Sequence, residues 1–337
     1  TRLCGKWDGL DRMFFSDNGS TAVEVAVKMA WQHCHREAPE RQQVTAFAGA
    51  YHGDTFGAMA LGERGLFSAP FEPLLFAVAR APWPATWWGD GEIEQKEAQA
   101  LQRLDELLQT PTAAVIFEPL LQGAGGMAMV RETFLQAVEQ RAHAAGALVI
   151  ADEVLTGFGR SGSLFACHRA GIAPDIVSLS KGLTAGFLPM GVTLASEALY
   201  QSFVGPEPDR TFFHGHSFTA NPLGCAAAVA SLELLEREPQ RYTSIEARHR
   251  PHLEHLAEHR LVTKPRLLGG IAAFELPGDS GYLQPIGLEV QRLALEQGLF
   301  IRPLGSVVYL MPPLGINDGE LAQCYASLQA VLDALPL

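Results

Sequence analysis

The sequence has few lysines, few cysteines and no long apolar run. Its five cysteines are scattered and form no CxxC pair, which argues against a disulfide framework and favours a reducing compartment. No run approaches the roughly 18 apolar residues that a membrane-spanning helix needs. The first residues, Thr1–Cys4, do not resemble the apolar part of a signal peptide. We therefore expect a cytoplasmic protein.

An excess of positive charge is also absent. Asp and Glu number 37 against 25 Lys and Arg, so the formal net charge is -12. An acidic chain repels nucleic acid phosphates and anionic membranes, and we expect neither as a partner. Hydrophobic residues make up 47% and charged residues 18% of the 337 positions, which is typical of a globular protein with a large core and two domains.

Short apolar runs alternate with helical patterns over the first two thirds of the chain. This alternation predicts an α/β fold: a large, mostly parallel sheet with helices on both faces. Ligands bind beyond the carboxyl ends of the strands in such sheets, so the residues there are candidate site residues. The predicted strands are Met13–Ser16, Val44–Ala48, Ala113–Glu118, Ala147–Asp152, Ile176–Leu179 and Met190–Thr193, and the predicted helices are Thr21–His35, Lys96–Gln109, Arg131–Ala145 and Asn221–Glu236.

The pattern changes near Arg237, where Arg and His become frequent. We predict a large domain over 1–236 and a smaller α+β domain over 237–337. The elements expected in the smaller domain are the strands Gly270–Glu275 and Val307–Met311 and the helices Gly287–Gln297 and Asp318–Leu335.

Two residues at the ends of neighbouring predicted strands suggest a reactive site. Lys181 is the only one of five lysines at the carboxyl end of a strand, and Asp152 ends the strand before it. In a parallel sheet the two would lie at the same edge. A desolvated lysine can act as a nucleophilic amine, and an aspartate can pair with a protonated ring nitrogen. Two alternatives to a reactive site remain open. Lys181 could be an ordinary surface lysine, and Asp152 and Glu153 could be a pair of carboxylates in a solvated loop.

Other strand ends carry weaker signals. Gly19 and Ser20 directly precede a predicted helix, at whose N-terminus the N–H groups favour an anion such as phosphate, although an ordinary helix cap also explains them. Tyr51 could lie against a planar ligand or simply pack. A GxGxxG motif at Gly157–Gly162 begins too far after its strand for a dinucleotide site. An HxxEH motif at His255–His259 lies in a highly charged run, so we favour a solvated helix and expect no metal site.

Together these segments resemble the class III aminotransferases, which depend on pyridoxal phosphate (PLP). The resemblance extends from about Asp11 to Met311 and implies the fold type I of PLP-dependent transferases, with PLP as cofactor. It also explains the GxGxxG motif as the family's loop after the aspartate. The segments that carry the resemblance are Asp17–Ser20, Tyr51–Gly53, Phe117–Pro119, Asp152–Val154, Thr156–Arg160 and Ser180–Gly182.

Further segments resemble the branch of this family that converts 8-amino-7-oxononanoate to 7,8-diaminononanoate in biotin biosynthesis. S-adenosylmethionine is the usual amino donor in that branch, and lysine serves in some members. Two alternatives remain: another class III transaminase, acting on ω-amino acids, ornithine or 4-aminobutyrate, and a non-catalytic protein with the PLP fold. The segments are Tyr51–Met59, Gln122–Met127, His214–Phe218, Asn221–Leu223, Arg302–Gly305 and Tyr309–Pro313.

The resemblance implies roles for individual residues. Lys181 would hold PLP as a Schiff base, Asp152 would pair with the ring nitrogen, and Tyr51 would stack on the ring. The implied cofactor-binding residues are Gly19, Ser20, Tyr51, Glu118, Asp152, Val154, Lys181, His216 and Ser217, and the implied substrate-binding residues are Tyr51, Gly215, Arg302 and Tyr309.

The resemblance also implies an assembly. Ser217 would reach the phosphate of the neighbouring subunit's cofactor, so the active protein would be a homodimer with shared sites. Arg302 would bind the carboxylate of the substrate. Family members carry a segment ahead of the point where this sequence begins, which is missing here, and we expect substrate binding to depend on it.

Overall fold

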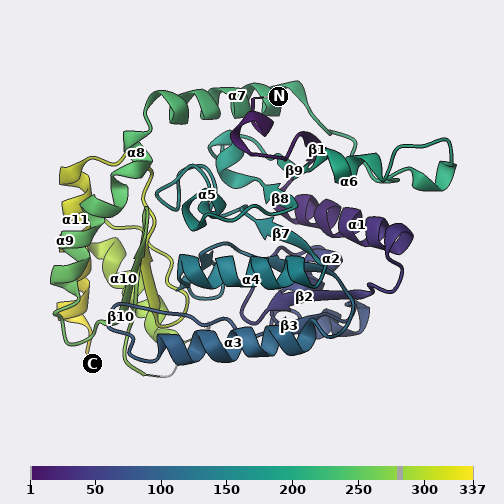
Figure 1. The fold of residues 1–337 in the computed structure, drawn as a ribbon. Helices are drawn as coiled ribbons and strands as arrows, with labels where there is room; N and C mark the ends of the chain where they lie inside the picture. The colour runs from purple at the N-terminus through teal and green to yellow at the C-terminus, as the bar shows by residue number, and fades with distance from the viewer. Residues whose placement is uncertain (1, 279–283, 337) are drawn as a thin grey trace.

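The computed structural model describes residues 2–278 and 284–336, and a seven-stranded sheet forms its centre (Figure 1). The strand order is β1-β9-β8-β7-β4-β2-β3. All neighbours are parallel except β9, which runs antiparallel to both β1 and β8. The predicted mostly parallel sheet is therefore confirmed. The strands are β1 (Arg12–Ser16), β2 (Gln43–Phe47), β3 (Ala79–Ala81), β4 (Thr112–Phe117), β7 (Leu148–Asp152), β8 (Ile176–Leu179) and β9 (Gly191–Ala195).

The sheet is covered on both faces, as the apolar strands predicted. In β4, Ala114 and Ile116 pack in one cluster with helix α1 (Gly19–Glu37). Val115 and Phe117 alternate with them and pack in another cluster with helix α4 (Glu132–Ala144). Side chains of a strand point alternately to the two faces, so a strand buried on both sides is apolar throughout.

The direction of β9 follows from the short link that precedes it. Between β8 and β9 the chain forms only the 3-10 helix η3 (Lys181–Thr184) and a turn. A parallel neighbour needs a crossover of a dozen or more residues, so this link returns the chain antiparallel. The same short link makes η3 the element that carries Lys181.

The C-terminal part forms a second, three-stranded antiparallel sheet at the left of Figure 1. In its middle strand, Ala272 and Phe274 pack with the C-terminal helices, whereas Ile271 and Ala273 belong to the main core. The boundary predicted between 236 and 237 remains a prediction. The elements are β10 (Thr263–Leu268), β11 (Ile271–Glu275), β12 (Val307–Leu310), α9 (Ile245–Leu256), α10 (Pro285–Glu296) and α11 (Asp318–Ala334).

The six strands and four helices predicted for the large domain, and the two strands and two helices predicted for the smaller one, are found, with ends that differ by at most three residues. Strands β3 and β10 and the short pair β5 (Leu121–Gln122) and β6 (Ala128–Met129) were not among the predicted elements. Helix α9 contains only the first two residues of the HxxEH motif, for which a solvated helix was favoured, and the rest of the motif lies beyond the end of the helix. No helix in the described ranges is long and apolar enough to span a bilayer. The remaining elements are η1 (Cys4–Lys6), α2 (Phe56–Leu61), η2 (Ala69–Leu74), α3 (Ile93–Leu107), α5 (Ala166–Ala170), α6 (Glu197–Gln201), η4 (Pro208–Arg210), α7 (Pro222–Arg237) and α8 (Gln240–Thr243).

Candidate active site

A cavity of about 580 Å³ opens at the carboxyl ends of the parallel strands. Seven of the residues singled out in the sequence line it, although they come from five separate segments of the chain. Its volume lies in the range typical of small-molecule sites. The lining residues are Asn18, Gly19, Ser20, Tyr51, His52, Gly53, Asp54, Thr55, Glu118, Ala124, Asp152, Val154, Leu155, Ser180 and Lys181.

Lys181 enters this cavity from a constrained turn. Its φ of 36° lies in the left-handed region, which is uncommon for a residue other than glycine. Two hydrogen bonds hold the turn: Ser180 Oγ donates to Met190 O at 2.6 Å, and Ser231 Oγ of α7 donates to Gly182 O at 3.0 Å. The backbone around Lys181 is thereby fixed while its side chain lies in the cavity.

Asp152 is buried in the same cavity and pairs with a histidine. Its Oδ2 lies 2.7 Å from His52 Nδ1, and its Oδ1 accepts a hydrogen bond from Val154 N at 3.0 Å. Both acceptor oxygens are engaged, so the orientation of the carboxylate is determined by its neighbours. His52 was missed in the sequence, although its position beside Tyr51 at a strand end was a usable signal.

Glu153 points to a different environment from Asp152. Its oxygens accept hydrogen bonds from the backbone N–H groups of Ala166 and Cys167 and from Thr156 Oγ1. These contacts cap helix α5, and burial raises the pKa of Glu153. The two adjacent carboxylates therefore separate: Asp152 lines the cavity and Glu153 supports the helix behind it.

Glu118 and Tyr51 are linked at another wall. Glu118 accepts hydrogen bonds from Tyr51 N at 3.0 Å and Gly123 N at 2.9 Å, and burial raises its pKa to about 7. Tyr51 donates from its hydroxyl to Asp54 Oδ2 at 2.9 Å. Burial and this hydrogen bond raise the pKa of Tyr51 to about 12, so its ring remains neutral at physiological pH.

The first turn of α1 forms a third wall. Asn18, rather than Ser20, caps the helix: its Oδ1 accepts from Thr21 N at 3.0 Å. Gly19 and Ser20 then present the first N–H groups of the helix, which lack partners within a helix and favour an anion. A Cβ at Gly19 would lie 2.8 Å from Val154 Cγ1, so only glycine allows this close approach.

A second cavity of about 650 Å³ adjoins the first, with which it shares Tyr51, Gly53, Asp54 and Ala124. Arg302 lines it, together with apolar side chains that include Met59 and Phe67. Asp54 and Glu63 also line it, and their carboxylates accept hydrogen bonds from the Tyr51 hydroxyl and from Gly49 N. The guanidinium of Arg302 beside the apolar side chains suits a ligand that has a carboxylate at the end of an aliphatic chain.

Four predicted site residues lie outside these two cavities in the single chain. Gly215 and Ser217 are exposed, and His216 Nδ1 lies 3.7 Å from Asp17 Oδ2 beside α1. Tyr309 is half-buried in β12 and packs against the main core. The roles assigned to these four residues remain predictions.

The cavity of Lys181 suits a flat, phosphorylated heterocycle that bears an aldehyde. It combines an amine, a buried carboxylate, an aromatic ring and a helix N-terminus. Gly19 and Ser20, at the start of α1, line this cavity, and a ligand phosphate is favoured at such a helix N-terminus. The residues present thus fit PLP.

The chain matches the aminotransferase class-III family over residues 1–332, and it belongs to this family. It is therefore a PLP-dependent aminotransferase with the expected fold type I.

Named relatives are similar over nearly the whole chain. The adenosylmethionine-8-amino-7-oxononanoate aminotransferase of Synechococcus elongatus is 57% identical over 97% of this chain and 77% of its own length. The crystal structure of the enzyme of that name from Methanocaldococcus jannaschii has a TM-score of 0.89 at 32% identity, covering 100% of this chain and 78% of the other. A PLP-bound amine transaminase from an uncultivated Pseudomonas species has a TM-score of 0.91 at 29% identity, over 98% and 79% of the two chains.

Proposed function

We propose that this chain transfers an amino group to 8-amino-7-oxononanoate and so makes 7,8-diaminononanoate for biotin biosynthesis. The name of the Synechococcus elongatus relative, at 57% identity, supports this substrate and supports S-adenosylmethionine as the amino donor. The observation that carries the proposal is the position of Arg302, in a cavity that adjoins the one shared by Lys181 and Asp152.

Lys181 and Asp152 would perform the chemistry. When bound, PLP supplies a protonated ring that accepts the electron pair released at the substrate carbon. Lys181 Nζ would hold the cofactor covalently and, once displaced by the donor amine, would carry a proton to and from the substrate carbon. Asp152, held by His52 and Val154 N, would keep the ring nitrogen protonated.

The other residues of the two cavities would bind and orient. The N–H groups of Gly19 and Ser20 would hold the phosphate, while Tyr51 and Val154 would contact the ring. The planar guanidinium of Arg302 would bind the substrate carboxylate with two parallel hydrogen bonds.

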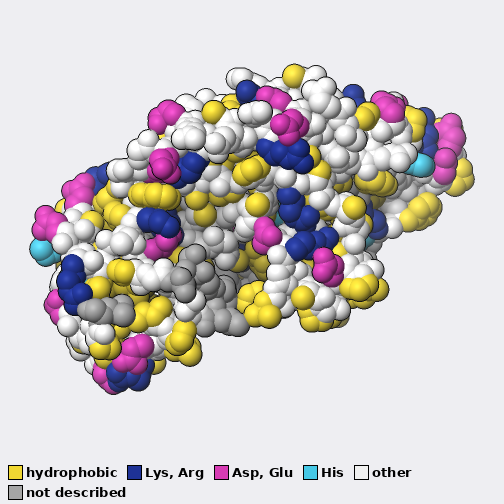
Figure 2. Space-filling model, turned by 90° about the horizontal axis from the view of Figure 1, so that it is seen from below, with side chains coloured by type: hydrophobic (Ala, Val, Ile, Leu, Met, Phe, Trp, Pro, Cys, Tyr) yellow, Lys and Arg dark blue, Asp and Glu magenta, His cyan; other side chains and the backbone are white. Residues whose placement is uncertain are grey.

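We further propose a cytoplasmic homodimer in which each subunit completes the other's site. Gly215, His216 and Ser217 lie outside the cavities of their own chain, which supports a role toward a neighbour. Apolar side chains around η2 are also exposed, including Leu66 at 65% and Leu74 at 66%. Apolar patches of this kind gather on the face shown in Figure 2 and are typical of protein interfaces.

The test is the visible absorbance of the PLP-loaded protein and the mass of its product. Wild type should show a visible band that bleaches with S-adenosylmethionine, and it should form 7,8-diaminononanoate when the keto acid is added. Lys181→Ala should lose the band, release PLP on dialysis and lose on the order of 1000-fold in kcat, because both the covalent link and the proton carrier are gone.

Lys6→Ala is the control, since Lys6 pairs with Glu236 away from both cavities. It should retain the band and the product. A Lys181→Ala protein whose visible band is unshifted would contradict the assignment of Lys181, and a wild type that bleaches with amines but leaves 8-amino-7-oxononanoate unchanged would contradict the substrate.

A further inference from the structure

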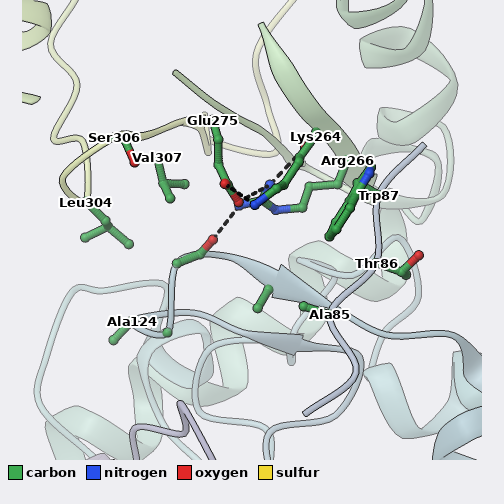
Figure 3. Close-up of a pocket in the computed structure, with 13 residues that line it drawn as sticks. Ala85, Thr86, Trp87, Ala124, Lys264, Arg266, Glu275, Leu304, Ser306 and Val307 are labelled. Carbon is green, nitrogen blue, oxygen red and sulfur yellow. Dashed lines mark hydrogen bonds and ion pairs between the residues drawn. The ribbon is translucent and has the colours of Figure 1, made fainter. Parts of the chain in front are cut away.

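A buried guanidinium joins the C-terminal sheet to the loop that walls the substrate cavity. Arg266 of β10 is only 4% exposed. Its Nε donates to Met127 O at 2.8 Å, and its Nη2 donates to Gly126 O at 2.7 Å. Figure 3 shows this side chain reaching from the sheet toward the loop, with Lys264 and Glu275 beside it.

The remaining contacts of Arg266 fix it in place. Its Nη1 donates to Lys264 O at 2.9 Å and lies 3.2 Å from Glu275 Oε1. The second oxygen of Glu275 pairs with Lys264 Nζ at 2.7 Å. Because a guanidinium is a rigid fork, it cannot shift without breaking several of these contacts at once. Arg266 therefore sets the distance between β10 and the loop.

The loop that Arg266 holds lies between three cavities. Ala124 lines the cavity of Lys181, the cavity of Arg302 and the third cavity, of about 430 Å³, drawn in Figure 3. The loop is also closely packed on its other side, where a Cβ at Gly125 would lie 2.3 Å from Gly49 O. A shift of this loop would therefore change the wall between cofactor and substrate.

Arg302 belongs to the same C-terminal unit as Arg266. It lies in the segment between α10 and β12, and β12 is joined through β11 to β10. The distance from Arg302 to Lys181 therefore depends on how the three-stranded sheet packs against the part of the chain that contains the seven-stranded sheet. Arg266 lies where these two parts meet.

We propose that Arg266 is a positioning residue that fixes the spacing between Arg302 and Lys181, and so selects substrates whose carboxylate lies a set distance from the reacting carbonyl. This proposal rests on the proposed function and deepens it. Arg266 lines neither the cavity of Lys181 nor that of Arg302, and it acts through the loop at 123–127 and through Arg302.

The experiment compares two acceptors in the PLP-loaded full chain: 8-amino-7-oxononanoate and 2-aminononan-3-one, which has a methyl group in place of the carboxylate. Arg266→Lys keeps the positive charge but replaces the rigid, planar guanidinium fork with a single ammonium on a flexible chain. We expect kcat/KM to fall about tenfold for the keto acid and less than about twofold for the methyl analogue. The reason is that a misplaced Arg302 affects only the acceptor that has a carboxylate, while the reacting groups stay in place. The visible band and its bleaching by S-adenosylmethionine should stay as in wild type.

Lys264→Gln is the matched control, because it removes a cation from the same strand and cavity without touching the loop carbonyls. It should leave both kcat/KM values within about twofold of wild type. Arg266→Gln, which can still donate to one carbonyl, serves if Arg266→Lys does not fold, and it should show the same selective loss.

The outcomes separate the two proposals. An unchanged ratio of the two kcat/KM values in Arg266→Lys, whether or not both fall, or the same selective loss in Lys264→Gln, overturns the role of Arg266. A wild type that does not convert the keto acid overturns the proposed function, and with it this inference.

Discussion

Gly53 shows how one residue determines whether two elements can meet at the site. Its φ is +128°, a conformation that side chains rarely adopt. A Cβ there would lie 2.1 Å from Ser20 Oγ, and the next residue, Asp54, donates from its N–H to that hydroxyl at 3.2 Å. The segment after β2 thus lies directly against the first turn of α1, where the phosphate is proposed to bind.

We predict that Gly53→Ala separates these two elements. The added methyl and the strained backbone should lower the free energy of unfolding by about 1–3 kcal/mol and weaken PLP binding. Urea unfolding and PLP titration by absorbance measure the two effects. Gly91→Ala is the control, since its Cβ would meet nothing within 4 Å. Wild-type PLP affinity in Gly53→Ala would refute the role of this contact.

At the scale of elements, helices α9 and α11 enclose a buried histidine. His249 Nδ1 lies 2.8 Å from the hydroxyl of Tyr325, and the ring is fully buried. Burial, together with the positive charges of Arg248 and His252, lowers the pKa of His249 to about 4. The imidazole is therefore neutral in the folded protein but protonates near pH 6.5 once unfolded.

This pair should make stability depend on pH in a defined direction. Because the folded pKa lies below the unfolded value, the contribution of His249 is present above about pH 6.5 and is lost as the pH falls toward about 4. The pKa shift corresponds to a decrease of up to ~3 kcal/mol in the free energy of unfolding over this pH range. His249→Leu should not show this decrease. Urea unfolding at several pH values tests this, with exposed His255→Gln as control. Equal pH slopes in wild type and His249→Leu would rule out the effect.

At the scale of the whole molecule, the shared-site proposal predicts complementation between inactive subunits. Lys181→Ala lacks the amine, and Ser217→Asp would repel the neighbour's phosphate. In a mixed dimer, one site has Lys181 from one subunit and Ser217 from the other. Because the dimer is symmetric, random mixing should restore about a quarter of wild-type activity.

The measurement is transaminase activity of the two variants refolded or co-expressed together. Each variant alone should be inactive. If Ser217 instead acted within its own subunit, no mixed dimer would contain an intact site and activity would stay absent. An active Ser217→Asp homodimer would show that this residue does not approach the phosphate.

The predicted elements were those whose pattern reflects burial. Continuous apolar strands such as β4 and the amphipathic helix α3 show a local periodicity that burial imposes. Strand β10 contains Lys264, Pro265 and Arg266, and α9 is rich in Arg and His with a proline inside, so neither has such a pattern. These elements form because tertiary contacts compensate for an unfavourable local sequence.

The sequence by itself determined the sheet, the place of Lys181 and Asp152 at one edge of it, and the family. These follow from periodicity, strand order along the chain and short motifs, all of which are local. Only the tertiary structure decided that His52 pairs with Asp152, that Glu153 turns away to cap α5, and that Arg266 holds the loop beside Ala124. Each of these contacts joins residues that no local pattern relates, because their distances depend on how separate elements pack.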